Sequence, residues 1–284
     1  MRAYPLLFIS CVGLSCHASG VPVPERDPAL PAATETVTFT SATLKLGGLL
    51  MRPEGKGPFP ALLYNHGSAP GSSSDTAFAY LAPVFAKQGW VFFMPYRRGQ
   101  GLSSSAGPYI MEEIEKARQT GGADAATKTQ LWLLQTDQLA DQLAGRAYLQ
   151  SLDFVQPRRI AVAGNSFGGI EALLGAEQGG YCAAVDAAGA AQGWSQSAAL
   201  RERMLHAVDN TRVPILFFQA ANDYDLSPSR ELFEFQHKAG RPAELKLYPA
   251  FGTTPADGHS FAYRGVAGWS ADVLDFLVRS CPAT

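Results

Sequence analysis

The stretch that decides the fold is Arg159-Ile160-Ala161-Val162-Ala163-Gly164-Asn165-Ser166-Phe167-Gly168-Gly169. Its apolar residues predict a buried strand, and the Gly-x-Ser-x-Gly that follows predicts a sharp turn from this strand into a helix. Ser166 would stand at the apex in a strained backbone conformation, and side chains at the two flanking glycines would collide with their surroundings. An ordinary glycine-rich turn fits the same pattern. The pattern therefore indicates a functional serine only if the rest of the chain supplies the residues that would act with it.

Apolar runs alternate with helical patterns along most of the chain. Buried strands are expected at 61–64, 90–94, 159–163, 181–187, 213–218 and 245–248, and helices at 77–87, 131–152, 170–177, 195–208, 229–239 and 266–279. Two short β-type runs, 36–40 and 43–51, predict an antiparallel hairpin ahead of them. Strands that alternate with helices form a parallel sheet with helices on both faces, so we expect an α/β fold.

Residues 101–128 interrupt this alternation. Here 103–107 is typical of a loop, 109–118 of a short charged helix, and Gly121-Gly122 of a break. An irregular segment of this length is usually either functional or disordered. Because it follows a strand that ends at the same edge of the sheet as Ser166, we expect it to form a rim or lid.

A serine hydroxyl needs a nearby base to take its proton, and the base needs an acid to orient it. The expected chain order is serine, acid, histidine, and the partners should follow later strands because the carboxyl ends of parallel strands share one edge. His259 meets these conditions, since it follows the strand at 245–248 through a loop and precedes the last helix. The other histidines stand in the leader, in helices or at an early strand end: His17, His206, His237 and His66.

Two aspartates compete for the role of the acid. Asp223 lies nearer the end of the strand at 213–218, where its carboxylate can reach His259. Asp225 stands beside Ser227-Pro228 and is typical of a turn or helix-capping residue. Asp257 is too close in sequence to His259 to orient it and is expected to be a turn residue. We therefore predict Asp223 as the acid.

An oxyanion formed at Ser166 would need two backbone N–H donors. Phe167, which follows the serine, should provide one of them. The loop after the strand at 61–64 should provide the other, from Ser68 or, as the alternative, Ala69. His66 is expected to hold this loop by hydrogen bonding.

Three further residues are candidates for substrate binding. Arg98, next to Arg97 at a strand end, would either meet a substrate carboxylate or form a structural salt bridge. Tyr109 and Trp194 would either line a pocket or pack in the core. No Cys/His/carboxylate spacing resembles a metal site, and no glycine-rich phosphate loop precedes a helix, so we expect neither a metal nor another cofactor.

From about residue 36 to 279 the chain resembles the dienelactone hydrolase family of α/β-hydrolases, and it is similar to the catalytic domain of the prolyl oligopeptidase group. The residues that carry the resemblance are Asn65-His66-Gly67, Tyr96-Arg97-Arg98-Gly99, Gly164-Asn165-Ser166-Phe167-Gly168-Gly169, Asn222-Asp223-Tyr224-Asp225 and Gly258-His259-Ser260-Phe261. The resemblance implies an α/β-hydrolase fold with an eight-stranded, mostly parallel sheet. It also implies a triad of Ser166, His259 and Asp223.

One departure bears on the reaction. Dienelactone hydrolases proper use a cysteine nucleophile where this chain has Ser166, which favours hydrolysis of ordinary small-molecule esters through an acyl-enzyme. A small serine peptidase or amidase is the alternative, although peptidases of the prolyl oligopeptidase group carry a large accessory domain for which we expect no room. A non-catalytic binding protein on the same fold is a third interpretation.

Composition limits the organisation and the partners. The chain has 284 residues, of which 46% are hydrophobic and 17% charged, enough for one large core, and we expect a single domain over 35–284. Its net charge is -2 and it contains no basic block, which argues against a nucleic-acid partner. Beyond the leader no stretch is expected to span a membrane, and the sequence carries no signal for an oligomeric state.

The start of the chain has the pattern of a secretory signal peptide over 1–20, with a basic start, an apolar run at 6–14 and a small-residue exit. That run is shorter than the ~20 residues that cross a bilayer. A first strand and an uncleaved anchor are the alternatives, and a lipoprotein attached through Cys16 is another, since Leu14-Ser15-Cys16 partly resembles a lipobox. We expect a proline-rich linker over 21–34 and a secreted or periplasmic protein.

Once the leader is removed, Cys182 and Cys281 are the remaining cysteines. An even pair in an exported chain indicates a disulfide, with two free thiols as the alternative. In the expected fold both lie at the edge of the sheet opposite Ser166.

Overall fold

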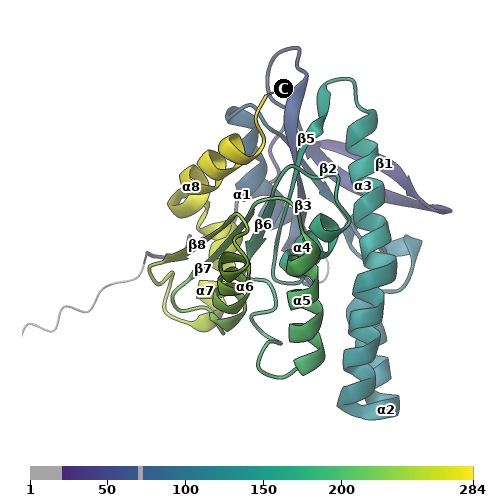
Figure 1. The fold of residues 1–284 in the computed structure, drawn as a ribbon. Helices are drawn as coiled ribbons and strands as arrows, with labels where there is room; N and C mark the ends of the chain where they lie inside the picture. The colour runs from purple at the N-terminus through teal and green to yellow at the C-terminus, as the bar shows by residue number, and fades with distance from the viewer. Residues whose placement is uncertain (1–20, 70–72, 284) are drawn as a thin grey trace, which may run out of the picture.

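The computed structural model describes residues 21–69 and 73–283, so the predicted signal peptide lies outside the described residues. An eight-stranded sheet forms its centre, in the order β1-β2-β4-β3-β5-β6-β7-β8 (Figure 1). The strands are β1 (Glu35–Ser41), β2 (Leu44–Met51), β3 (Phe59–Asn65), β4 (Val91–Pro95), β5 (Val155–Asn165), β6 (Ala184–Ala187), β7 (Ile215–Ala220) and β8 (Ala243–Tyr248). β2 runs antiparallel to β1 and β4, and the other neighbours pair in parallel. The α/β prediction is confirmed.

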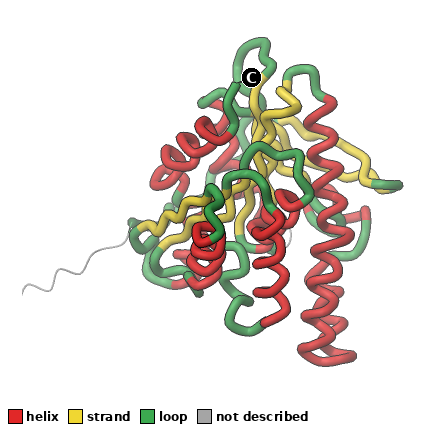
Figure 2. Tube along the Cα trace, in the orientation of Figure 1, coloured by secondary structure: helices red, strands yellow, loops and turns green. Residues whose placement is uncertain are grey.

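Helices cover both faces of the sheet (Figure 2). They are α1 (Ser73–Lys87), α2 (Ile110–Leu133), α3 (Leu139–Ser151), α4 (Phe167–Glu177), α5 (Ala198–Asn210), α6 (Ser227–Lys238), α7 (Pro255–Arg264) and α8 (Val266–Ser280), with the 3₁₀ segment η1 (Gly101–Ala106) and the π-helical segment η2 (Leu134–Gln138). Side chains alternate between the faces of a strand. Leu63 of β3 accordingly packs in the cluster that includes α3 to α6, and Leu62 in the cluster that includes α1, α7 and α8.

The prediction of an irregular segment over 101–128 is wrong, because most of it is helical. After η1, helix α2 is interrupted at Gly122, and its second part continues through η2 into α3 as the long rod at the right of Figure 1. The predicted break coincides with a kink, since Gly122 has φ 76° and ψ −166°. Four apolar residues spaced along α2 are buried in the core and hold it there: Ile110, Ile114, Ala126 and Leu133.

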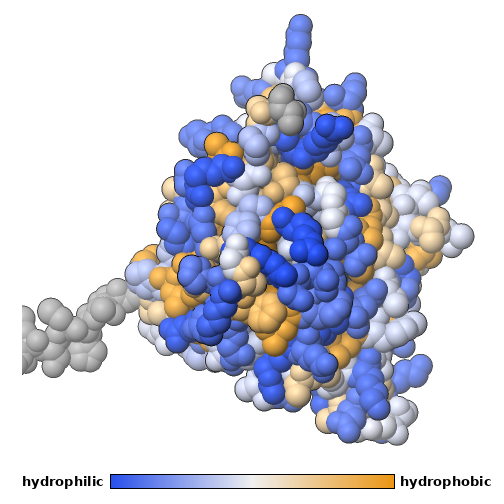
Figure 3. Space-filling model, in the orientation of Figure 1, coloured by the Kyte–Doolittle hydropathy of each residue, from blue (hydrophilic) through white to orange (hydrophobic). Residues whose placement is uncertain are grey.

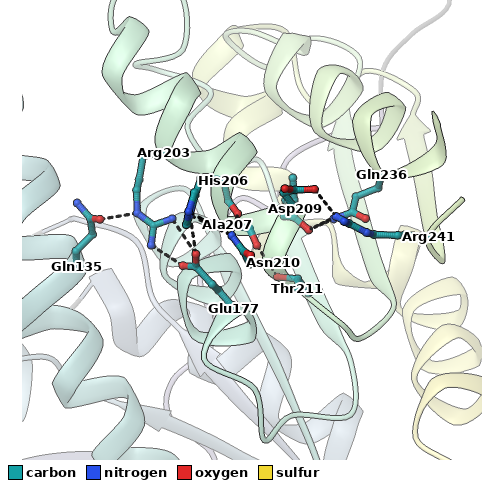
Figure 4. A network of polar contacts seen from close by, with 11 residues as sticks. Gln135, Glu177, Arg203, His206, Ala207, Asp209, Asn210, Thr211, Gln236 and Arg241 are labelled. Carbon is teal, nitrogen blue, oxygen red and sulfur yellow. Dashed lines mark hydrogen bonds and ion pairs between the residues drawn. The ribbon is translucent and has the colours of Figure 1, made fainter. Parts of the chain in front are cut away.

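A polar network attaches this rod to the neighbouring helices (Figure 4). Arg203 of α5 donates to Gln135 of η2 at 2.5 Å and forms an ion pair with Glu177 of α4 at 2.5 Å. The Glu177 carboxylate is 8% exposed and also lies 2.9 Å from Nδ1 of His206. Elements that are far apart in sequence are therefore fixed together on one side of the sheet.

The predicted linker over 21–34 lies against the domain. The N–H of Val21 donates to Ala250, and the N–H of Gly252 donates back to Val21. Asp27 accepts from Arg264 at 2.6 Å. This segment is therefore extended chain that packs beside the end of β8 and α7.

Cys182, ahead of β6, and Cys281, at the end of α8, form a disulfide with their Cα atoms 5.2 Å apart. This bond joins two points that are 99 residues apart in sequence.

Hydrophilic residues cover most of the surface seen in Figure 3, and its apolar patches are scattered. Within residues 21–69 and 73–283, none of the helices combines the length and the apolar character that a bilayer crossing needs.

Candidate active site

Ser166 stands at the apex of the turn between β5 and α4, with φ 55° and ψ −119°. A residue other than glycine rarely adopts positive φ, and such strain concentrates at functional sites. A Cβ on Gly164 would lie 2.1 Å from the carbonyl oxygen of Gly168, and a Cβ on Gly168 would lie 1.9 Å from that of Asn65. The two glycines are therefore required by close backbone contacts on either side of the serine.

Backbone amides of two segments lie beside Ser166. Phe167 is the first residue of α4, where an N–H has no acceptor within the helix. Gly67, Ser68 and Ala69 follow β3 and line the same cavity as Ser166. A Cβ on Gly67 would lie 3.8 Å from that of Ser166, so the loop after β3 passes close to the serine, as the sequence predicts.

His259 and Asp223 meet at the same edge of the sheet. Nδ1 of His259 lies 2.8 Å from Oδ1 of Asp223, whose side chain is 1% exposed. The carboxylate also accepts from Nε2 of Gln219 at 3.0 Å and from the N–H of Tyr224 at 2.7 Å. These donors fix the carboxylate in one orientation, so it can hold the imidazole with Nε2 directed away from Asp223.

The competing aspartates have other partners. Asp225 accepts from the N–H of Ser227 at 2.8 Å just before α6, in the turn role that was one of its two expected roles. Asp257 forms a capping box with Thr254 at the start of α7. This box shows that the loop predicted around His259 is wrong, because His259 lies inside α7.

A cavity of about 200 Å³ brings the predicted residues together. Ser166 and His259 line it, together with the loop after β3. The sequence analysis missed three polar residues that also line it: Ser74, Gln192 and Tyr263. Ser74 follows β3 and Gln192 follows β6, so the argument from the shared strand edge could have found both of them.

The three candidates for substrate binding lie elsewhere. Arg98 forms ion pairs with Asp141 at 2.7 Å and with Asp137 at 2.9 Å, in the structural role that was its alternative. Trp194 is 2% exposed and packs in the core. Tyr109 donates its hydroxyl proton to the carbonyl of Ser68. None of them is among the residues that line the cavity, and Arg98 and Trp194 have the structural roles that were their alternatives.

His66 and Arg97 hold the loop after β3 by hydrogen bonds to its backbone. Burial and the Arg97 charge hold the pKa of His66 well below its usual range, so its ring is neutral. Its Nδ1 lies 2.8 Å from the carbonyl oxygen of Gly67 and donates to it. The loop-holding role expected for His66 is thus observed.

In the part of the chain that the structure describes, no cluster of three His, Cys, Asp or Glu side chains has a geometry suited to a metal ion.

A model of the dienelactone hydrolase family matches residues 46–273, which is most of the chain. The chain belongs to the dienelactone hydrolase family. No curated protein matches this family member in sequence.

Several solved structures have a fold similar to that of this chain, at low sequence identity. A putative dienelactone hydrolase from Klebsiella pneumoniae subsp. pneumoniae MGH 78578 has a TM-score of 0.62 and 16% identity, with 87% of this chain and 98% of that chain covered. Esterase Est22 has a TM-score of 0.62 and 15% identity, with 86% and 80% covered.

An acylaminoacyl peptidase from Pyrococcus horikoshii has a TM-score of 0.61 and 16% identity, with 87% of this chain covered. The chain spans 41% of that peptidase. At such identities the similarity shows a shared fold, which is the α/β-hydrolase fold.

Two carboxyl groups of this dienelactone hydrolase family member are buried and are not among the residues that line the cavity. Glu171 of α4 is fully buried, and desolvation raises its pKa to about 8 although the Arg97 charge lowers it. Desolvation likewise raises the pKa of Asp186 in β6 to about 7, against the effect of a hydrogen bond from the N–H of Gly189. Neither was identified from the sequence, where an acidic residue in a short apolar segment gave no sign of its burial.

Proposed function

We propose that the protein hydrolyses carboxylic esters of small molecules through an acyl-enzyme, with Ser166 as nucleophile, His259 as general base and Asp223 as the acid that orients it. The observation that carries the proposal is the 2.8 Å contact between Nδ1 of His259 and Asp223, at a cavity that Ser166 also lines. In this arrangement Asp223 fixes the imidazole tautomer whose Nε2 accepts a proton, which activation of a serine requires.

The reaction has two halves. Oγ of Ser166 attacks the ester carbonyl while His259 takes its proton, and Asp223 stabilises the imidazolium that forms. The carbonyl oxygen becomes an oxyanion that accepts hydrogen bonds from the N–H groups of Phe167 and Ser68. His259 then protonates the leaving alcohol. In the second half a water molecule loses its proton to His259 and attacks the acyl carbon. His259 then returns this proton to Oγ of Ser166 as the bond to the serine breaks and the carboxylic acid leaves.

A peptidase or amidase would use the same residues, and acylaminoacyl peptidases share the fold. Matched ester and anilide substrates with one acyl group separate the two activities. We expect turnover of the ester at a rate far above that of the anilide, because an alcohol leaves the tetrahedral intermediate more readily than an arylamine. Comparable turnover of the two would instead support the peptidase.

The decisive experiment is labelling with a fluorophosphonate probe, which reacts with an activated serine. We expect the wild type to be labelled and Ser166→Ala to stay unlabelled and folded, with residual hydrolysis ~10³- to 10⁴-fold above the uncatalysed rate. Absence of labelling in the wild type, or equal labelling of the variant, would contradict the proposal and favour a binding protein on the same fold.

We also infer a secreted or periplasmic location. The support is the disulfide between Cys182 and Cys281, since such bonds persist in oxidising compartments. Detection of the mature protein outside the cytoplasm, with a sequenced N-terminus near residue 21, would test both the location and the predicted signal peptide. A lipid on Cys16 would support the lipoprotein alternative.

A further inference from the structure

The loop after β3 is held by a buried arginine that contacts the loop backbone, the ring of His66 and Gln100. Arg97 is 1% exposed. Its Nη1 donates to the carbonyl of His66 at 2.8 Å and its Nη2 to the carbonyl of Gly67 at 3.0 Å. The side-chain atoms near Nη2 are Oε1 of Gln100 and Nδ1 of His66, each at 3.3 Å. The guanidinium fork therefore fixes two successive peptide groups.

Fixing a carbonyl also fixes the N–H of the same peptide group. In a planar trans peptide the C=O and the N–H point in opposite directions, and the one cis bond among the described residues is Gly57-Pro58. Because the Gly67 carbonyl points at Arg97, the N–H of Ser68 points away from Arg97. This N–H is the one that the proposed reaction assigns to the oxyanion.

Tyr109 acts in the same way one peptide further along. Its hydroxyl donates to the carbonyl of Ser68, so the N–H of Ala69 points away from Tyr109. Ser68 and Ala69 both line the cavity beside Ser166. Each of the two side chains thus holds one carbonyl of the loop and leaves the amide of the same peptide group pointing away from itself.

The loop needs this restraint because Gly67 has no side chain to limit its rotation. A peptide group next to glycine can flip at low cost, which would replace the Ser68 N–H by a carbonyl oxygen. The Gly67 carbonyl accepts from both Arg97 and the neutral ring of His66. A flip would leave these buried donors without an acceptor, at considerable cost.

We propose that Arg97 and Tyr109 are positioning residues that orient the N–H groups of Ser68 and Ala69 toward the oxyanion of the transition state. The inference rests on the proposed role of Ser166. Neither side chain contacts the substrate. Both act through the backbone, so they affect the transition state and leave ground-state binding nearly unchanged.

The test compares Arg97→Lys and Tyr109→Phe with the wild type. An ammonium group is a single point donor that cannot reproduce the fork of Arg97, and phenylalanine removes only the hydroxyl. With a short-chain p-nitrophenyl ester we expect kcat to fall about 10- to 100-fold in Arg97→Lys and less in Tyr109→Phe, while KM changes by less than about threefold. Affinity for a trifluoromethyl ketone, which forms an oxyanion on the serine, should fall in parallel with kcat.

Two matched variants control for loss of stability alone. Arg203→Lys alters an arginine that bonds Glu177 and Gln135, and Tyr181→Phe removes a buried hydroxyl that accepts from Gln142. Neither residue lines the cavity, and we expect both variants to keep the kcat of the wild type. Equal losses in these variants and in the two test variants would overturn the inference.

The remaining outcomes are also decisive. Unchanged kcat and ketone affinity in Tyr109→Phe, or a rise in KM alone, would overturn the inference even if Arg97→Lys does not fold. If the wild type labels with the fluorophosphonate and the variants turn over normally, only the positioning role fails. If the wild type neither labels nor turns over ester, the proposed function fails with it.

Discussion

Nδ1 of His259 lies 2.8 Å from Oδ1 of Asp223, and the second oxygen of that carboxylate is held by Gln219 at 3.0 Å. Asp225, two residues further along, accepts from the N–H of Ser227 and does not reach the imidazole. Two aspartates in one short segment therefore have separate roles, which substitution can distinguish.

Asp223→Asn should lower kcat by about 10⁴-fold, because an amide in place of the carboxylate favours the wrong imidazole tautomer and leaves the imidazolium unstabilised. Asp225→Asn is the matched control and should keep nearly the wild-type kcat, since the asparagine oxygen can still accept from the N–H of Ser227. Steady-state kinetics on one ester measures both. A large loss in Asp225→Asn and a small one in Asp223→Asn would reverse the assignment.

Gly168→Ala should destabilise the fold by about 3 kcal/mol or prevent folding, because the new Cβ would lie 1.9 Å from the carbonyl oxygen of Asn65 and both atoms belong to fixed backbone. Gly193→Ala is the control, since its Cβ would meet only the end of the Leu200 side chain at 3.3 Å. Urea unfolding compares them. Equal stability of the two variants would show that the turn relaxes more than this geometry allows.

Glu171 should make stability fall as pH rises. Its folded pKa of about 8 exceeds the ordinary glutamate value, so the folded protein holds a proton that the unfolded chain releases between these values. This contribution is complete below about pH 4.5 and is lost as pH rises through about 8. Relative to Glu171→Gln, the free energy of unfolding of the wild type should fall by up to about 1.4 kcal/mol per pH unit between about pH 5 and 8.

Denaturant unfolding at a series of pH values measures this slope. Glu115→Gln, at an exposed position of α2, should follow the wild type. Parallel curves for the wild type and Glu171→Gln would mean that Glu171 is not a buried neutral acid.

Replacing both Cys182 and Cys281 by alanine should lower the free energy of unfolding by about 2–5 kcal/mol, because the bond closes a loop across 99 residues. Reduction of the wild-type protein should produce a similar loss, and kcat should change little since the bond lies at the edge of the sheet opposite Ser166. Identical unfolding curves before and after reduction would contradict this.

The sheet and the three residues proposed as a triad were predictable because one geometric rule governs them. Parallel strands bring their carboxyl ends to a single edge, so Ser166, Asp223 and His259 could be placed together by chain order alone. Helix α7 was not predicted. The glycine before His259 suggests a loop, whereas the capping box of Thr254 and Asp257 starts a helix there.

The side-chain contacts of two neighbouring arginines could not be predicted from the sequence. Arg97 and Arg98 are chemically identical and adjacent, yet one is buried behind the loop after β3 and the other forms ion pairs with Asp137 and Asp141. Their partners lie far away in sequence, so only packing decides which side chain points where. The two alternatives for Trp194 stayed open for the same reason, since an aromatic residue in a loop is equally suited to a pocket wall and to the core, where the structure places it.

The kink at Gly122 offers a point of attachment for protein engineering. Residues 118–124 are exposed, and a Cβ on Gly122 would meet nothing within 4 Å. Exposed turns of this kind tolerate inserted sequence. An affinity peptide or reporter placed there would extend from the end of the helical rod, where it could tether the protein to a support without altering any of the residues that line the cavity.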